Sequence, residues 1–312
     1  MDYIANTVYN VVNIFNTAAP EPSLYITDDD EQVIFYNYFG IAYKTVYLPI
    51  NTRIELELLK NSKLQVLELQ SRTKEIKDYN KVQAILDNLP KTLNKLSLTY
   101  YNTYSNTYSN TYSNTSIEND ISEQNAIKYK LAYNNLPSNL IELNLTIPEM
   151  CQSLDNLPTT NLQKLLINCN YFDIDLKCLP QTLKVLHLEC ANFNKPLDNL
   201  PSQLEEFYLN SNSFNHSLNN LPNSIKTLKL YLSNIFDDNH EYVIDKLPGN
   251  LETLHLKNNR LKPNTGNKYI INTLPIFIRI VVIINVCVHN INHLEKTYPH
   301  VCFEYFGCEK LV

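Results

Sequence analysis

The clearest pattern in this chain is a phrase of regularly spaced leucines, L-P-x-x-L-x-x-L-x-L, which returns along most of its length. In the final L-x-L both leucines point to one face of an extended strand, because side chains alternate with period two. Leu186 and Leu188 are therefore predicted to point inward, while Val185, His187 and Glu189 point outward. The pattern predicts a series of short strands, each buried on one face.

The phrase also has a nearly fixed period, marked by nine Leu-Pro pairs. From the third pair onward they lie 21, 22, 21, 21, 26 and 27 residues apart. Such a period is typical of a solenoid, in which each turn buries its apolar face only against its neighbours. We therefore predict a leucine-rich-repeat solenoid of the α/β class: a curved, right-handed coil of mostly parallel strands, with extended or 3₁₀ returns and a cap at each end. Proline suits the return segments, since it has no N–H for a strand pair. The pairs are Leu48-Pro49, Leu89-Pro90, Leu136-Pro137, Leu157-Pro158, Leu179-Pro180, Leu200-Pro201, Leu221-Pro222, Leu247-Pro248 and Leu274-Pro275.

Two further positions recur after the strands. Asparagine occurs at Asn170, Asn212 and Asn259, where leucine-rich repeats place a buried amide that bonds the neighbouring turn. An apolar residue follows two positions later, at Phe172, Phe214 and Leu261, and Phe193 takes that place after Ala191 in the unit between the first two.

Two of these units resemble one repeat family. Phe193-Asn194-Lys195-Pro196-Leu197 and Phe214-Asn215-His216-Ser217-Leu218, each followed by a Leu-Pro pair, are similar to FNIP repeats. FNIP repeats are a leucine-rich-repeat variant of social amoebae and of giant DNA viruses of amoebae. The resemblance is specific over residues 150–230 and looser over 60–285. Many viral relatives carry an F-box-like segment in front of the repeats, which implies recruitment of a ubiquitin-ligase scaffold; its usual opening, a Leu-Pro followed by an amphipathic helical pair, is missing here.

The patterns divide the chain into three parts. Residues 1–57 are predicted to form an N-terminal cap or degenerate repeats, residues 58–284 the leucine-rich, FNIP-like repeats, and residues 285–312 a C-terminal cap. An insertion at about 100–131 contains copies of N-T-Y-S; it is polar and has no core-forming pattern, so we expect it to be disordered.

The C-terminal tail predicts a short helix near 291–297 and a strand near 300–306. The outward positions of the last repeat strand, Ile280, Val282 and Ile284, are all apolar. We therefore expect the tail to cover them.

The composition of the chain bears on the class of its binding partner and on its cellular compartment. A net charge of −6 gives no basic field for phosphate backbones, which argues against nucleic-acid binding. Seven cysteines without a C-x-x-C pair, and a start that does not resemble a signal sequence, favour a reduced, intracellular, cytoplasmic location, in the host cytoplasm if the protein is viral. The most apolar stretch, 276–288, contains Arg279 and is too short to span a bilayer, so no membrane association is expected.

The outward strand positions are expected to form columns across the sheet. His187 and His255 would stand three strands apart, about 14 Å, which is too far for a shared metal ion. Cys169 and Cys190 would stack on neighbouring turns; small buried residues are favoured there over a redox pair or part of a metal site. We expect no catalytic residue, metal or cofactor. The candidate residues for binding a protein partner on the concave sheet are His187, Glu206, Tyr208, Lys229, Tyr231, His255 and Lys257.

These features predict a non-enzymatic protein-interaction module. The alternative is a substrate-recognition adaptor of a ubiquitin ligase, as the FNIP resemblance implies. An enzyme similar to bacterial leucine-rich-repeat effectors would need a large helical catalytic domain, and fewer than forty residues follow the last Leu-Pro pair.

Overall fold

The chain divides into two compact units in the computed structural model, which describes residues 23–25, 45–49, 56–71, 79–100, 131–147, 153–233, 241–258 and 268–307. This division runs through the repeats, so it differs from the caps and repeats expected from the sequence, whose boundaries stay a prediction. The first unit comprises Met1–Ser109, Glu118–Pro148 and Asn156–Leu162, and the second comprises Asn110–Ile117, Glu149–Asp155 and Gln163–Val312.

In the first unit the strands follow one another in chain order and pair in parallel. Two helices, α1 (Leu56–Lys60) and α2 (Tyr79–Leu86), lie in the segments that connect strands. The strands are β1 (Ser23–Tyr25), β2 (Thr45–Pro49), β3 (Val66–Ser71), β4 (Lys95–Tyr100) and β5 (Glu142–Thr146).

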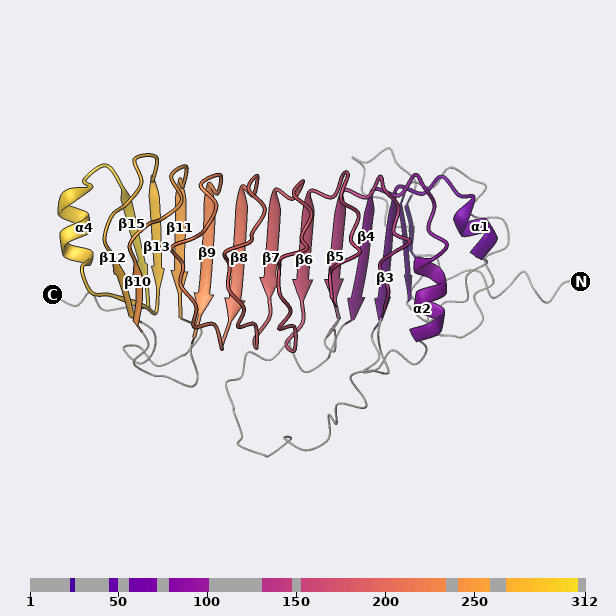
Figure 1. The fold of residues 1–312 in the computed structure, drawn as a ribbon, viewed down its shortest axis with the longest axis horizontal. Coiled ribbons are helices and arrows are strands. Elements are labelled where there is room, and N and C mark those ends of the chain that lie inside the picture. Colours follow the sequence, from indigo (N-terminus) through magenta and orange to yellow (C-terminus); the bar gives the residue numbers. More distant parts are fainter. Residues whose placement is uncertain are drawn as a thin grey trace, which may run out of the picture. The chain divides into compact units, whose positions relative to one another are not determined.

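In the second unit the main strands also pair in parallel (Figure 1). They are β6 (Lys164–Asn168), β7 (Val185–Glu189), β8 (Glu206–Ser211), β9 (Thr227–Leu232), β11 (Thr253–Lys257), β13 (Ile280–Ile284) and β15 (Cys302–Phe306). Between them, the longer repeats add a second parallel sheet of β10 (Glu241–Ile244), β12 (Lys268–Ile271) and β14 (Cys287–Val288). The steps of 26 and 27 residues therefore accommodate an extra return strand.

The buried and exposed positions alternate as predicted. Along β7, Leu186 and Leu188 are fully buried, while Val185, His187 and Glu189 are half-exposed. The returns that follow β6, β7 and β8 are turns joined by extended segments. Parallel strands that repeat every turn, with leucines on one face, confirm the leucine-rich-repeat solenoid.

The Leu-Pro phrase forms the same turn in seven repeats. The proline carbonyl accepts a hydrogen bond from the N–H three residues on, as from Leu183 to Pro180 at 3.1 Å. That third residue is buried each time. The phrase L-P-x-x-L is therefore a tight turn that delivers its second apolar residue into the core. The bonded pairs are Pro90–Leu93, Pro137–Leu140, Pro180–Leu183, Pro201–Leu204, Pro222–Ile225, Pro248–Leu251 and Pro275–Ile278.

The first Leu-Pro pair is an exception to the predicted pattern. Leu48 and Pro49 end strand β2, and Pro49 pairs with Gln70 of β3. A proline is tolerated in a strand where its missing N–H is not needed, as at a strand end. This pair belongs to a strand and not to a return.

An aromatic stack runs through the returns of the second unit, at the apolar position that recurs in the sequence. Phe172, Phe193 and Phe214 are buried, and their ring centroids are 6.1 and 6.4 Å apart. Tyr242 of β10 continues the stack at 6.4 Å from Phe214, and Tyr269 of β12 lies 5.1 Å beyond. The Tyr242 hydroxyl donates to the Phe214 carbonyl, whereas the buried Tyr269 hydroxyl has no hydrogen-bond partner among the described residues. Leu261 lies outside the described residues.

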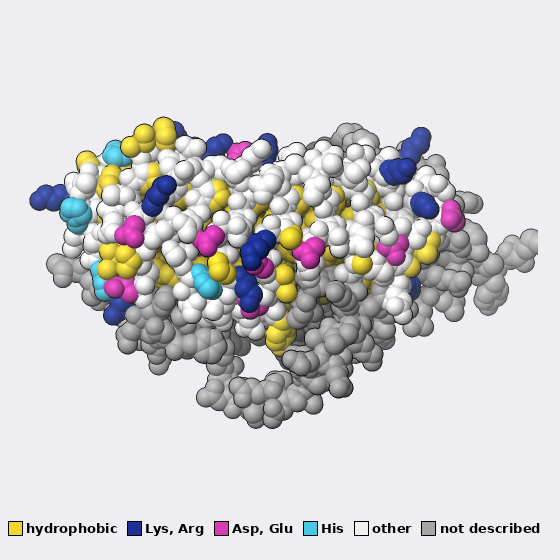
Figure 2. Space-filling view, viewed as in Figure 1, with side chains coloured by type: hydrophobic (Ala, Val, Ile, Leu, Met, Phe, Trp, Pro, Cys, Tyr) yellow, Lys and Arg dark blue, Asp and Glu magenta, His cyan; other side chains and the backbone are white. Residues whose placement is uncertain are grey.

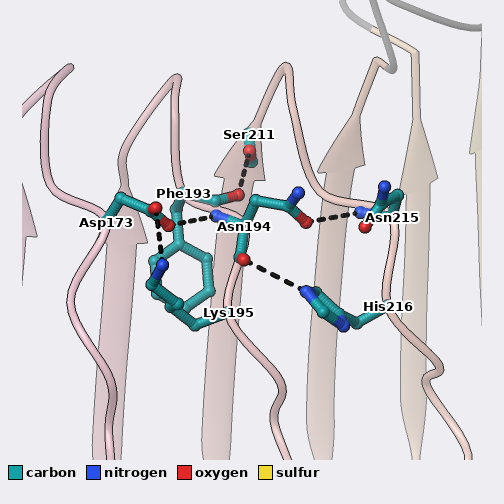
Figure 3. Close-up of polar contacts among 7 residues, drawn as sticks. All are labelled: Asp173, Phe193, Asn194, Lys195, Ser211, Asn215 and His216. Atoms are coloured by element: carbon teal, nitrogen blue, oxygen red, sulfur yellow. Dashed lines mark hydrogen bonds and ion pairs between the residues drawn. The ribbon is translucent and has the colours of Figure 1, made fainter.

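A ladder of short polar side chains accompanies this stack (Figure 3). Asp173 accepts a hydrogen bond from the Asn194 N–H at 2.8 Å, and Asn194 in turn accepts one from the Asn215 N–H at 3.0 Å. Lys195 also pairs with Asp173 at 2.8 Å, and the Asn194 carbonyl bonds the His216 ring at 3.0 Å. The Phe-Asn pair thus serves both purposes of a return: the ring packs inward and the amide links to the next turn.

The position of the buried polar residue was predicted wrongly. Asn170 is exposed and Asn212 is half-buried, because the inward alternation of each strand reaches the residue before the asparagine and places that residue inside. Ser211, for example, donates to the Phe193 carbonyl at 2.8 Å. Asn259 lies outside the described residues. The inward column is Cys169, Cys190, Ser211, Leu232 and Asn258.

The C-terminal tail forms the predicted elements in a different arrangement. Helix α4 (Ile291–Thr297) and strand β15 match the expected positions, but β15 pairs beside β13 instead of lying over its outward face. The reason is the alternation of side chains along β15, which pairs Phe303 and Tyr305 with the inward residues of β13. The tail therefore adds one more strand. The N-T-Y-S insertion at 101–130 lies outside the described residues.

Candidate functional site

The predicted partner-binding residues lie on the outward face of β7, β8, β9 and β11. The register places His187, Tyr208, Lys229 and His255 in one column across these strands. Tyr231 and Lys257 are paired in the next column, and Glu206 stands one column to the other side. All seven side chains are half-exposed. We call these seven residues the strand-face patch.

Glu206 joins two basic side chains of the patch through one oxygen. Its Oε1 lies 3.0 Å from His187 Nε2 and 3.1 Å from Lys229 Nζ. Burial alone would raise the pKa of Glu206, but the hydrogen bonds from Lys229 and His187 outweigh it and hold this pKa below its usual value. The carboxylate is therefore ionised at neutral pH and fixes the positions of both neighbours.

Aromatic contacts extend this network across the strands. The rings of His187 and Tyr208 meet edge to face with centroids 5.6 Å apart, and those of Tyr208 and Tyr231 do so at 5.1 Å. Lys257 Nζ lies 4.9 Å from the centroid of the Tyr231 ring, a cation–π contact. Six of the predicted residues are thus connected by direct contacts from β7 to β11.

His255, the seventh residue, pairs with Lys229 in the sheet. Burial lowers the pKa of His255, the Lys229 charge lowers it further, and Glu304 opposes both. Its imidazole is therefore neutral at pH 7. His187 and His255 stand three strands apart, as predicted. Within the described ranges no group of histidine, cysteine or acidic side chains could hold a metal ion.

The two stacked cysteines are buried as small core residues. Cys169 and Cys190 occupy equivalent inward positions, and both thiols are reduced. Burial strongly raises the pKa of Cys190, and its Sγ lies 3.7 Å from the Ile167 carbonyl oxygen. A thiol that stays protonated and has no access to solvent is a poor nucleophile and a poor metal ligand.

Sequence reasoning missed the contacts that order the patch. It identified the columns but not the shared Glu206 oxygen, the ring contacts or the hydrogen bond from Asn168 Nδ2 to Glu189 Oε2 at 3.2 Å.

In the face drawn in Figure 2, basic and acidic side chains are interspersed among neutral ones rather than gathered into a field of one sign. None of the helices in the described parts of the chain is long and apolar enough to cross a membrane.

Comparison with known proteins adds little. No family model matches the chain, and no curated protein matches it. It is similar to a solved structure described as that of CroV588, a novel circular LRR protein, with 14% sequence identity and a TM-score of 0.26. The match covers 85% of this chain and 50% of the other, so this chain spans about half of that protein's length. A score this low supports no further inference.

Proposed function

We propose that this chain is an FNIP-type leucine-rich-repeat protein that binds a protein partner on its strand-face patch and carries out no catalysis itself. The ladder formed by Asp173, Asn194 and Asn215 supports the FNIP assignment, because the asparagine of Phe193-Asn194 links the returns on either side of it. Residues 1–57 are proposed as an N-terminal cap or degenerate repeats, and residues 285–312 as a C-terminal cap. No cofactor or metal is needed, and the proposed location is the cytoplasm, that of the host cell if the protein is viral.

The observation that carries the proposal is the connected patch from β7 to β11. Tyr208 and Tyr231 are half-exposed aromatic residues near its middle, and such residues supply a large share of the binding energy in protein interfaces. Their neighbours already hold them in place through the contacts described above. Ordered side chains lose less conformational entropy when a partner binds, which favours binding.

Site-specific photocrosslinking tests the proposal. Tyr208→p-benzoylphenylalanine places the reactive group in the patch, and Tyr171→p-benzoylphenylalanine places it at an exposed position in a return. In cells that make the protein, the position-208 variant should crosslink to one discrete protein and the position-171 variant should not. Equal crosslinking from both positions would contradict the proposal.

A second variant measures the contribution of the aromatic residues. Tyr208→Ala combined with Tyr231→Ala should weaken binding of the crosslinked partner by 2 kcal/mol or more, about 30-fold, as expected for hot-spot residues. The matched control is Tyr171→Ala, which should bind normally.

The alternative role as a ubiquitin-ligase adaptor uses the same surface but also requires a recruitment element within residues 1–57. Copurification of a cullin scaffold with the full chain, lost on deletion of residues 1–57, would support the adaptor role. Partner capture without the scaffold would support the simple interaction module.

A further inference from the structure

Three basic side chains stand together at one end of the strand-face patch: Lys229 on β9, and His255 and Lys257 on β11. Lys229 and His255 are paired across the two strands, which in a parallel sheet lie about 4.8 Å apart. Lys257 follows His255 on the same face, about 7 Å along the strand. The three residues therefore occupy neighbouring positions on the same face of the sheet.

Glu206, the acidic residue that contacts this group from β8, is already engaged. Glu206 contacts Lys229 at 3.1 Å and shares the same oxygen with His187 at 3.0 Å. The single carboxylate of Glu206 therefore contacts both Lys229 and His187.

The other two basic residues have less compensation. Lys257 lies over the ring of Tyr231, and within the described residues no carboxylate contacts it. His255 is separated from Glu304 by the whole of strand β13, where Val282 stands between them in the same column. Lys229 is paired with Glu206 and His255 is neutral at pH 7, so the charge that no contacting carboxylate among the described residues offsets is that of Lys257.

The protonation of His255 should respond to an anion bound beside it. Burial and the neighbouring Lys229 charge lower its pKa, and Glu304, the acidic residue that faces it from β15, only partly offsets them. Lys257 on its own strand adds a further positive charge. A carboxylate bound here would stabilise the protonated imidazole, so binding would take up a proton.

The surroundings distinguish between kinds of anion. Tyr231 and Tyr208 flank the three basic residues and offer apolar contact to neighbouring parts of a ligand. Glu206 and Glu189 would repel a continuous phosphate backbone, as would the net charge of −6. An isolated carboxylate on a peptide that also carries apolar side chains suits this mixture better.

We propose that Lys229, His255 and Lys257 bind a carboxylate side chain in an acidic segment of the partner protein. This inference rests on the proposed function of the strand-face patch and specifies the chemistry of its partner.

Selection from a random peptide library displayed on phage tests the proposal with the purified full chain as bait. The selected peptides should contain Asp and Glu about twofold more often than the unselected library, because charge-assisted hydrogen bonds favour them. The enrichment should disappear with the Lys229→Gln, Lys257→Gln double variant. It should persist with Lys246→Gln, a matched change at an exposed lysine in a return. Acidic enrichment that survives the double variant, or no enrichment with the native bait, would overturn the proposal.

The Tyr208→Ala, Tyr231→Ala variant separates this inference from the proposed function. Peptides that depend on both tyrosines but show no preference for acidic residues would overturn the carboxylate site and leave the strand-face patch as a binding surface. Peptides that depend on neither would count against both.

The role of His255 has its own readout. A fluorescently labelled peptide from the acidic selection should bind about threefold to tenfold more tightly at pH 6.0 than at pH 7.5, as a raised histidine pKa in the complex requires. His255→Asn should abolish this pH dependence while leaving the protein folded, as checked by circular dichroism. Equal affinity of the native chain at both pH values would overturn the assignment of His255 to the site.

Discussion

The connecting segments of the two units differ more than their strands do. Between β3 and β4 the first unit uses helix α2, whereas the returns between β6 and β9 use no helix and pack a phenylalanine. The strands of both units nonetheless bury leucines at the same alternate positions, such as Leu98 in β4 and Leu228 in β9. Leucines at alternate strand positions are therefore sufficient for the solenoid turn, and the segment that connects successive strands can vary.

The outward faces of the two units differ as well. On β4 and β5 the outward side chains are a mixture: Ser97 bonds Thr99 at 3.0 Å and Thr146 donates to Asn144 at 3.2 Å. Beside these small neutral residues, Lys95 forms an ion pair with Glu142 at 3.4 Å. From β7 to β11 the outward side chains are aromatic and charged. Because outward positions contribute little to the core, they can differ without changing the fold.

The sharpest test of the difference in returns is Phe193→Ala. The ring is buried and stacks on Phe172 and Phe214, so its removal should lower the free energy of unfolding by about 3–5 kcal/mol. Urea unfolding measures the change. Phe277→Ala, at a side chain that is 52% exposed, is the matched control and should cost under about 0.5 kcal/mol. Similar losses for both would mean that the stack does not stabilise the returns.

The strand pattern that both units share is tested by Leu228→Ala and Leu98→Ala. Both leucines are fully buried, so each change should cost about 2–5 kcal/mol in the same urea experiment. A neutral result at either position would show that its unit does not follow the common register.

The polar ladder should make a smaller contribution. Asn194→Ala removes the acceptor for the Asn215 N–H and should cost about 0.5–1.5 kcal/mol. Asn194→Asp keeps an acceptor at the same place, as Asp173 does one turn earlier, and should retain most of the stability. If the two variants were equally destabilised, the ladder bond would not be the cause.

The smallest effect concerns pH. The folded-state pKa of Glu206 is below its usual value, so its stabilising contribution is present above about pH 4.3, the unfolded value, and is lost as the pH falls through the folded value. Because the Glu206 side chain is 31% exposed, this contribution should be under about 1 kcal/mol. Glu206→Gln should therefore lower the melting temperature slightly at pH 7 and not at pH 3. A difference that persists at pH 3 would have another origin.

Local patterns in the sequence were enough to predict most strands, because L-x-L fixes both their position and their buried face. They also identified Phe172, Phe193 and Phe214 as a recurring apolar position, but not the stacking of their rings. They did not predict the sheet of β10, β12 and β14, since these short strands lack the leucine phrase and pair only across neighbouring turns. The buried polar position was predicted one residue too late for a related reason. The point at which inward and outward side chains stop alternating along a strand depends on the neighbouring strand.

The strand-face patch shows the same limit. Its columns follow from the strand register, which the leucines determine. Its contacts depend on side-chain conformation: one oxygen of Glu206 reaches across to both His187 and Lys229. No spacing in the sequence contains that information.

The ladder from Asp173 through Asn194 to Asn215 has a consequence for how such a protein changes length. At both joints a side-chain oxygen, of Asp173 or of Asn194, accepts from the N–H of the equivalent residue one turn on, so these 21-residue units are joined in the same way. Duplication or loss of a whole unit leaves every remaining joint intact. A lineage carrying this repeat can thus lengthen or shorten its binding surface in single genetic steps.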